Sequence, residues 1–274
     1  MTRIPSDAYI MIIGAMKCGT SSLFDYLKII PQVCPALTKE PEFFSEHQGH
    51  RYHVEVYDKL FNFNANKHKY VLEASTGYTK YPMEPNVARK IFEYGINPKF
   101  IYIVRNPFDR IESHYNFMVR KGSIKIKIDS SHLVNLSNYF LQLEQFRIYF
   151  PSENLLLLDF DNLKTHPKQV LYDVFEFIGL TKNFMPDKFI VSNETANENR
   201  VINEYRSRYN KILPYIPKPI KLLGAKLMRL KFPEQNRRLS DIEREYIYQA
   251  LKDDMLKFSK VYDFDVSKWG FKSE

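Results

Sequence analysis

The stretch YIMIIGAMKCGTSSLFDYL, residues 9–27, joins an apolar run, a glycine-containing loop and an amphipathic segment in direct succession. A loop between a buried strand and a helix gathers main-chain N–H groups and a helix N-terminus around one point, which is a site for an anion. Gly14, Gly19 and Ser21 keep the spacing of a loop that binds nucleoside triphosphates, G-x-x-x-x-G-K-[ST]. Thr20, however, stands where that loop has its lysine. The lysine of this chain, Lys17, lies three residues earlier. The sequence therefore predicts a phosphate-binding loop with a displaced cation.

Small and hydroxyl-bearing residues make up most of this loop. Gly14 and Gly19 are expected to let the backbone approach a ligand closely. Thr20, Ser21 and Ser22 add hydroxyl donors. A structural alternative is a plain turn before a helix that Thr20 caps, but this alternative leaves the displaced lysine unexplained.

Short β-rich runs followed by helical periodicity recur over the first 180 residues. The runs are continuous rather than alternating, as in FIYIV and LLLLDF, which is typical of strands buried on both faces of a parallel sheet. The expected strands cover residues 9–13, 70–73, 100–104 and 155–160, and the expected helices cover about 20–30, 85–94, 107–120 and 166–179. These elements predict an α/β fold, a P-loop-like open parallel sheet flanked by helices on both faces, with right-handed crossovers.

Strand signals stop beyond Leu180. The remaining expected segments are a polar loop at 192–200, a helix at about 201–213, a proline-marked break at 214–219 and a last helix at about 239–259. Ser240 with Glu243 resembles a capping box at the start of that last helix. Residues 181–274 are therefore predicted to be a helical lid and outer layer on a nucleotide-binding core of residues 1–180, so that 1–274 is a single domain.

The charge balance favours an anionic partner without naming one. The chain of 274 residues contains 40 Lys and Arg against 32 Asp and Glu, a formal charge of +8. The densest basic stretches, 120–127 and 217–231, are typical of solvated faces. The second stretch is also apolar enough to contact a membrane surface peripherally.

Targeting and redox signals favour a cytoplasmic setting. No apolar run approaches the roughly 18–20 residues that span a bilayer, and the apolar segment 8–16 lacks the flanks of a signal peptide. Two cysteines give no disulfide framework. A reducing compartment is therefore expected.

Two motifs carry a resemblance to a known family. The run G-A-M-K-C-G-T-S-S-L resembles the 5′-phosphosulfate loop, G-x-x-K-[SGC]-G-T-[ST]-x-L, of the sulfotransferases that use 3′-phosphoadenosine 5′-phosphosulfate (PAPS). The run F-I-Y-I-V-R-N-P-F-D-R-I-E-S resembles the 3′-phosphate element of that family, R-[DN]-P with a serine eight residues after the arginine. An arginine at the carboxyl end of a parallel strand points into the ligand crevice, and its planar fork suits phosphate. The resemblance runs from about residue 8 to residue 180.

The resemblance implies the ligands and the residues that hold them. PAPS is the expected donor, 3′,5′-adenosine bisphosphate is the expected product, and no metal is required. Lys17 is expected to follow the oxygen that bridges the 5′-phosphate and the sulfuryl group, where charge builds as the bond breaks. The implied donor-binding residues are Lys17, Cys18, Gly19, Thr20, Ser21, Ser22, Arg105, Ser113 and Arg200.

The same resemblance implies a general base for the acceptor. The segment T-K-E-P-E-F-F-S resembles the K-E-x-x-F-F element of heparan-type and many bacterial sulfotransferases, which puts the base on Glu40, with Lys17 as the other catalytic residue. Glu42 is the alternative if the loop register differs by two residues. In heparan-type enzymes a lysine that assists catalysis follows the glutamate that matches Glu73, but Ala74 stands there. Lys17 is then the only strong cation expected near the leaving oxygen.

Other candidate residues have open roles. Glu73, at the end of the second expected strand, is expected near the acceptor or the loop lysine. Arg200 is expected to reach the 3′-phosphate or the adenine from the polar loop. His47, His50 and His53 recur at intervals of three, for which a zinc site, acceptor contact and plain packing are the alternatives.

The favoured function is therefore PAPS-dependent transfer of a sulfuryl group to a small-molecule or glycan acceptor, such as a carbohydrate, a glycolipid or a phenol, with no nucleic acid as partner. A metal-dependent nucleotide or small-molecule kinase shares the sheet and the loop. Thr20 in the lysine's place and a strand at 100–104 that ends in arginine rather than aspartate disfavour it. A non-catalytic module that binds nucleic acid or an anionic glycan is supported only by the +8 charge.

Overall fold

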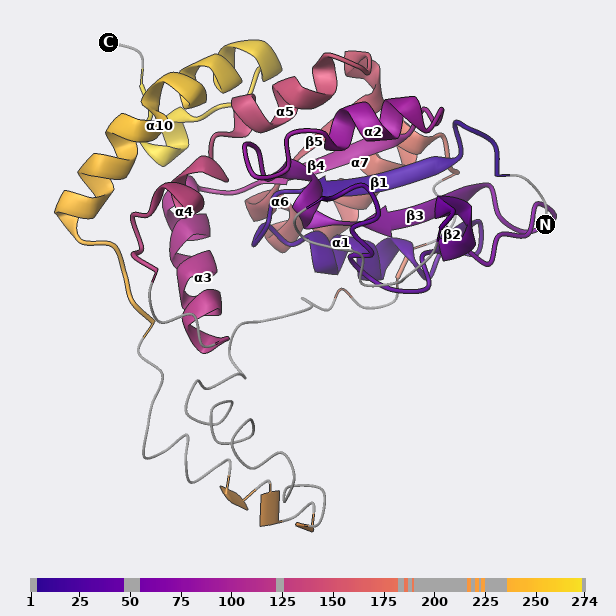
Figure 1. Cartoon of the computed structure of the whole chain (residues 1–274), viewed down its shortest axis with the longest axis horizontal. Coiled ribbons are helices and arrows are strands. Elements are labelled where there is room, and N and C mark those ends of the chain that lie inside the picture. The colour runs from indigo at the N-terminus through magenta and orange to yellow at the C-terminus, as the bar shows by residue number, and fades with distance from the viewer. Residues whose placement is uncertain are drawn as a thin grey trace.

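The computed structural model describes residues 4–46, 55–121, 126–181 and 236–272, together with isolated positions between 185 and 224. Its centre is a five-stranded parallel sheet with the strand order β2-β3-β1-β4-β5 (Figure 1). The strands are β1 (Tyr9–Gly14), β2 (Val33–Pro35), β3 (Tyr70–Ala74), β4 (Lys99–Val104) and β5 (Leu155–Asp159). The predicted α/β fold with an open parallel sheet is confirmed.

The strand order reverses at β1. The chain leaves β1 through α1 (Thr20–Leu27) to reach β2 and β3 on one side of β1, and it returns through α2 (Val87–Glu93) to β4 on the other side. Because such crossovers are right-handed, the reversal puts α1 and α2 on opposite faces of the sheet, as Figure 1 shows. The carboxyl end of β1 is therefore the switch point at which open α/β sheets bind ligands.

Further helices cover the sheet and form an outer layer. They are α3 (Pro107–Arg120), α4 (Ser131–Asn135), α5 (Tyr139–Arg147), α6 (Phe160–Thr165), α7 (Pro167–Ile178) and α10 (Asp241–Tyr262), with the 3-10 turns η1 (Tyr57–Leu60), η2 (Thr76–Thr79), η3 (Ser152–Asn154) and η6 (Ser267–Trp269). In Figure 1, α10, drawn in yellow, runs beside α5 and away from the strands.

The four predicted strands and the helices between them are present, with corrections at their ends. The helix α1 ends at Leu27 rather than near residue 30. Phe160 begins α6 instead of ending a strand, because the Asp159 carboxylate accepts the Asp161 N–H at 2.9 Å and caps a helix there. Pro167 then starts α7 as a separate helix. The sequence patterns did not reveal β2, α4 or α5, and the helix expected at about 201–213 lies outside the described residues.

The core is built around β1, all of whose residues are buried. Helix α1 packs Leu23 and Leu27 against it, and both side chains are fully buried. On the neighbouring strand, Ile101 and Ile103 are equally inaccessible. Because the central strands are covered on both faces, every position favours an apolar side chain, which explains the continuous apolar runs in the sequence.

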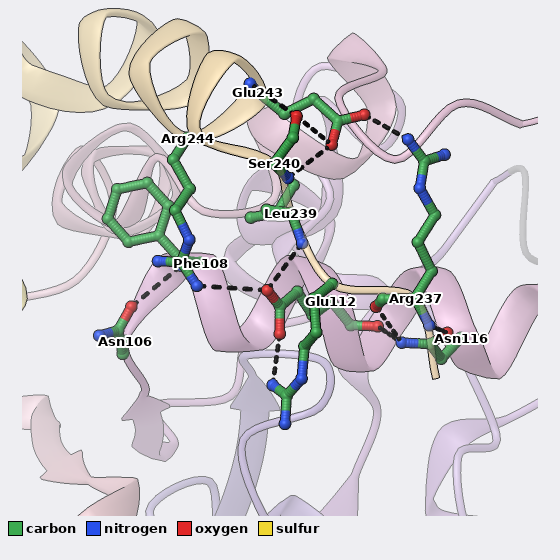
Figure 2. A network of polar contacts seen from close by, with 10 residues as sticks. Asn106, Phe108, Glu112, Asn116, Arg237, Leu239, Ser240, Glu243 and Arg244 are labelled. Atoms are coloured by element: carbon green, nitrogen blue, oxygen red, sulfur yellow. Dashed lines mark hydrogen bonds and ion pairs between the residues drawn. The ribbon is translucent and has the colours of Figure 1, made fainter. Parts of the chain in front are cut away.

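A buried carboxylate fixes the start of α10 to α3 (Figure 2). Glu112 on α3 is only 2% exposed, yet it carries an acid group. Its carboxylate accepts the Leu239 N–H at 3.0 Å and pairs with the guanidinium groups of Arg238 at 2.5 Å and Arg244 at 3.3 Å. Buried carboxylates are stable only when they are paired and hydrogen-bonded in this way. Residues 238–244 are therefore fixed to α3.

Two local motifs extend this attachment. The Asn116 side-chain amide donates to the Arg237 carbonyl at 3.0 Å, and the Arg237 N–H donates to the Asn116 oxygen at 2.9 Å (Figure 2). The predicted capping box is confirmed, because the Glu243 N–H donates to Ser240 Oγ at 3.3 Å and the Ser240 N–H donates to Glu243 Oε2 at 2.9 Å.

The remainder of α10 contacts α5, and the end of the chain contacts β5. The Asp254 carboxylate on α10 accepts the first N–H groups of α5, from Phe140 at 3.0 Å and Leu141 at 2.9 Å. Lys268 lies 2.5 Å from Asp159 at the end of β5. The division into a core of 1–180 and a lid of 181–274 remains a prediction. Among the helices described, none combines the length and the apolarity needed to cross a bilayer.

Candidate active site

The loop after β1 is folded tightly at the switch point. The Ala15 N–H donates to the Ile103 carbonyl of β4 at 2.9 Å, and the Cys18 N–H donates to the Ala15 carbonyl at 3.2 Å. Gly19, with φ 86°, is the residue before α1, and no side chain within the described residues caps that helix. Because Thr20 is the first helical residue, the alternative in which it caps the helix is wrong. The first turn of α1 presents its N–H groups at the edge of β1, an arrangement that binds anions.

The two glycines of the loop contact protein atoms. A Cβ added at Gly14 would lie 2.2 Å from Thr79 Oγ1 and 2.7 Å from the Tyr102 ring. A Cβ added at Gly19 would lie 3.1 Å from the Phe160 ring. The expected close approach of a ligand to these two glycines stays a prediction, and the structure adds a packing reason for them. They allow η2, β4 and α6 to pack closely around the loop and so fix its shape.

Lys17 is a half-buried cation in this loop, with φ 71°. Its ammonium lies 4.5 Å from the centre of the Phe117 ring on α3. Burial, together with the charges of Arg120 and Arg105, lowers the pKa of Lys17 from 10.5 to about 8, while the Glu40 carboxylate opposes the shift. An ammonium that has lost water and lies among other cations gains most from an anionic ligand.

Arg105 connects the two sequence motifs in space. It follows β4, and its Nη1 donates to the Lys17 carbonyl at 3.3 Å. Its guanidinium lies 4.7 Å from the centre of the Phe160 ring. The Tyr139 hydroxyl donates to the Arg105 carbonyl at 2.6 Å and so fixes the main chain. The two elements that the sequence assigns to the donor therefore meet.

The other residues of the predicted donor site lie on the loop, α1 and α3. Thr20 and Ser22 are buried in the first turn of α1, with Ser21 half-buried between them. Ser113 is half-buried about two turns into α3, as predicted. Cys18 is fully buried, and burial raises the pKa of its thiol to about 12. Cys18 therefore shapes the loop as a protonated, unreactive residue.

Glu40 lies at the carboxyl end of β3, next to the loop. Its N–H donates to the Ala74 carbonyl at 3.0 Å, and Thr76 Oγ1 lies 3.4 Å from its Oε1. The side chain is 21% exposed, and the carboxylate raises the pKa of Lys17. A partly exposed carboxylate beside the loop lysine is suited to accept a proton from a bound acceptor.

Glu42, the alternative base, is a structural residue. It is 2% exposed, and its carboxylate accepts the Gly77 N–H at 3.0 Å and the Ser45 hydroxyl at 2.9 Å. Its own N–H donates to Ser75 Oγ at 3.1 Å. Burial raises the pKa of Glu42. Both carboxylate oxygens of Glu42 are therefore engaged in the core, whereas Glu40 is partly exposed; which of the two is the base stays a prediction.

A cation whose place sequence reasoning did not predict lies beside the loop. Lys39 Nζ donates to Ser21 Oγ and lies 4.0 Å from Glu40 Oε1. A second cation, Arg120, is buried at the end of α3 and acts on Lys17. Lys17 is therefore not the only cation at the loop, and the expectation that it is the only strong one near the leaving oxygen stays a prediction. Lys39 is the lysine of the K-E-x-x-F-F element, but that pattern gave it no role, because its contact with Ser21 depends on where the chain runs after β2.

Glu73 lies among aromatic rings within the core. The hydroxyl of Tyr57 donates to its Oε2, and the hydroxyl of Ser75 donates to its Oε1 at 2.5 Å. Burial raises the pKa of Glu73 to about 7, although hydrogen bonds from Ser75, Tyr57 and Tyr78 oppose the shift. Glu73 is thus enclosed in the core by its hydrogen-bond partners, and its expected place near the acceptor or the loop lysine stays a prediction.

Four candidate residues, His47, His50, His53 and Arg200, lie outside the described residues, so their roles stay predictions. Across the part of the chain that the structure describes, no group of three or more metal-ligating side chains comes together.

Comparisons with known proteins point to one family. A family model described as a sulfotransferase domain matches residues 7–220. The chain is 29% identical over 187 residues to the heparan sulfate glucosamine 3-O-sulfotransferase 5 of Mus musculus, a match that covers 62% of this chain and 53% of that protein. It is 30% identical over 134 residues to the membrane-associated sulfotransferase kil1 of Dictyostelium discoideum, covering 46% and 27% of the two chains. The chain thus spans about half the length or less of these curated relatives.

A solved structure shares the fold over nearly the whole chain. The sulfotransferase from Alicyclobacillus acidocaldarius superposes with a TM-score of 0.68 at 20% identity, covering 98% of this chain and 99% of the other. The five-stranded sheet and its flanking helices are therefore an arrangement that this chain has in common with a known protein.

Proposed function

The chain belongs to the sulfotransferase domain family, and on that basis we propose that it transfers a sulfuryl group from PAPS to a hydroxyl or amine of an acceptor. The contact between Arg105 and the Lys17 carbonyl, at 3.3 Å, carries the proposal. It joins the end of β4 to the loop after β1 at the switch point of the sheet. Two adjacent anion-binding elements suit a ligand with two phosphates, such as 3′,5′-adenosine bisphosphate.

The donor is proposed to bind across these two elements. The N–H groups of the first turn of α1 and the hydroxyls of Thr20, Ser21 and Ser22 hold the 5′-phosphosulfate end. Arg105 and Ser113 hold the 3′-phosphate. A guanidinium suits this second role because its N–H groups form a rigid fork that matches phosphate oxygens.

The transfer step follows from the charges at the site. The acceptor oxygen or nitrogen attacks sulfur in line and forms a new bond, while the bond between sulfur and the bridging oxygen breaks. The electron pair of the broken bond goes to that oxygen, which becomes part of the 5′-phosphate, and Lys17 stabilises its charge. The acceptor proton goes to the Glu40 carboxylate. The products are the sulfated acceptor and 3′,5′-adenosine bisphosphate.

No metal has a part in this proposal. The sulfuryl group that is transferred carries less negative charge than a γ-phosphoryl group, and side-chain cations of the protein already lie at the loop. The kinase alternative, by contrast, needs a metal that spans phosphate oxygens.

The proposed acceptor is a carbohydrate or a glycolipid. Support comes from the curated relatives, among them a protein named as acting on a glucosamine of heparan sulfate. The proposed location is the cytoplasm, which is supported by two cysteines that are both free and buried.

Thermal stabilisation by three ligands tests the donor assignment. We expect 3′,5′-adenosine bisphosphate to raise the melting temperature, because it binds only the folded protein, and we expect Mg-ATP and oligonucleotides to have little effect. Stabilisation by Mg-ATP alone would support the kinase instead, and stabilisation by oligonucleotides alone would support a nucleic-acid module. Labelled PAPS offered with a panel of sugars, glycolipids and phenols then identifies the acceptor.

A further inference from the structure

Lys39 lies where the proposed donor loop and the proposed base meet. Its Nζ donates to Ser21 Oγ in the first turn of α1, and it lies 4.0 Å from Glu40 Oε1. Its side chain is 33% exposed, so the ammonium is reached by solvent and by ligands. Glu40 itself is tied to the end of β3 through its N–H. One ammonium thus contacts the loop after β1 and approaches the carboxylate after β2.

The geometry points to Lys39 as a donor-binding residue for the 5′ end of the nucleotide, and this inference rests on the proposed function. A phosphate at the N-terminus of α1 lies within reach of the first-turn hydroxyls. Ser21 carries one of these hydroxyls, and Lys39 is already bonded to it. A ligand oxygen that approaches Ser21 therefore also approaches the Lys39 ammonium.

The capacity of an ammonium group fits this role. It has three N–H donors, so Lys39 can hold Ser21, face Glu40 and still donate to a phosphate oxygen. The present partners of Lys39 are weak ones, a neutral hydroxyl and a carboxylate at the long distance of 4.0 Å. A phosphate dianion is a stronger partner than either, because both groups of the resulting hydrogen bond are charged.

Lys39 and Lys17 are placed at different sides of the same loop. Lys17 lies against α3, with its ammonium over the Phe117 ring. Lys39 comes from the chain between β2 and η1 and contacts α1. The 5′ end of the donor is therefore proposed to bind between two lysines, and the carboxylate of Glu40 lies beside the second of them.

A purely structural role is the competing explanation. In that case Lys39 only joins the T-K-E-P segment to α1 through Ser21. The two explanations differ in whether Lys39 acts through Ser21 alone. A structural lysine acts only through the Ser21 hydroxyl, so its loss has no further effect on 5′-phosphate binding once that hydroxyl is removed, whereas a donor-binding lysine still contributes in Ser21→Ala.

Calorimetric titration with 3′,5′-adenosine bisphosphate and with 3′-adenosine monophosphate separates them. The proteins are the wild type, Lys39→Met, Lys39→Arg, Ser21→Ala, the double variant Ser21→Ala/Lys39→Met and the control Lys28→Met. Where the heat of binding is too small to fit directly, the affinity is measured by competition. Lys28 is an exposed lysine paired with Asp25 at 2.6 Å, just past the end of α1. Melting temperatures are compared first, so that a folding defect is recognised.

We expect Lys39→Met to weaken binding of the bisphosphate by about tenfold to a hundredfold, the range for one hydrogen bond to a charged group. Binding of the 3′-monophosphate should stay within about twofold of the wild type. Lys39→Arg should retain most of the affinity for the bisphosphate. Lys28→Met should leave the affinities for both nucleotides unchanged. The double variant should bind the bisphosphate about tenfold or more weakly than Ser21→Ala. An unchanged affinity for the bisphosphate in Lys39→Met, an equal loss for both nucleotides, or equal affinities in Ser21→Ala and the double variant overturns the inference. If the wild type binds neither nucleotide, the proposed function itself has failed.

Discussion

The Gly77 N–H donates to Glu42 Oε1 at 3.0 Å, and a Cβ at Gly77 would lie only 2.0 Å from the other oxygen of that carboxylate. Glu42 is thus closed in by the backbone of η2. Glu40, two residues earlier, keeps a partly exposed carboxylate. Two glutamates of one short segment are in this way divided between a structural role and a candidate chemical role.

Glu40→Gln should lower turnover with the acceptor found in the panel by about 10²- to 10⁴-fold, the usual contribution of a general base, and should leave the melting temperature unchanged. Glu42→Ala should instead lower the melting temperature and leave turnover by the folded enzyme largely unchanged. It leaves the buried Gly77 N–H without its acceptor, at a cost of about 1–3 kcal/mol, which calorimetric melting detects. Full activity in Glu40→Gln would remove this carboxylate from the mechanism.

Arg105→Ala should weaken binding of 3′,5′-adenosine bisphosphate by about tenfold to a hundredfold, because a charged hydrogen bond to phosphate is lost. Adenosine 5′-monophosphate lacks the 3′-phosphate, so its affinity should fall much less. The measurement is the ratio of the two dissociation constants in the wild type and the variant. An unchanged ratio would mean that the 3′-phosphate binds elsewhere.

Binding of the bisphosphate should weaken as the pH rises through about 8, the lowered pKa of Lys17. Below this value Lys17 is an ammonium and attracts the ligand, and above it the free protein must take up a proton before the ion pair can form. Titrations across the range from about pH 7 to about pH 9.5 should therefore show a falling affinity in the wild type. Lys17→Met should bind more weakly at neutral pH and with a flatter profile. If affinity fell with pH in parallel in the wild type and in Lys17→Met, the group that titrates would be one other than Lys17.

Glu73 should make stability depend on pH. Its pKa is raised from 4.5 to about 7 by burial, so the folded protein keeps a proton that the unfolded chain releases. Its contribution is therefore fully present below pH 4.5 and is lost as the pH rises through about 7. Urea unfolding at about pH 5 and about pH 8 should show the wild type losing up to roughly 3 kcal/mol more than Glu73→Gln. Identical losses in the two proteins would mean that Glu73 stays ionised throughout.

The parts of the fold that were predictable from sequence are those with a local signal. A strand buried on both faces needs apolar residues at every position, so β1, β3, β4 and β5 were visible as runs. The loop after β1 was visible through its glycines and Lys17. By contrast, β2 has only the three residues Val33–Pro35, too few to show a period, and it exists because it pairs with β3.

In the candidate site, too, only residues with a local sequence signal were predictable. Arg105 and Lys17 were predictable because each ends or follows a strong strand, and parallel strands bring their carboxyl ends together. Lys39 reaches Ser21 from 18 residues away through a loop without periodicity, so no pattern predicted that contact. Gly14 was interpreted through its own loop, whereas its close neighbour is Thr79.

The attachments of Glu112, Asp254 and Asp159 have a consequence for how the chain holds together. Each joins the stretch from residue 236 onward to α3, α5 or β5 by contacts that do not pass through residues 182–235. A protease cut within that interval would therefore leave two fragments that stay associated without a peptide bond between them. The C-terminal helix could accordingly be supplied as a separate polypeptide and still assemble with the rest.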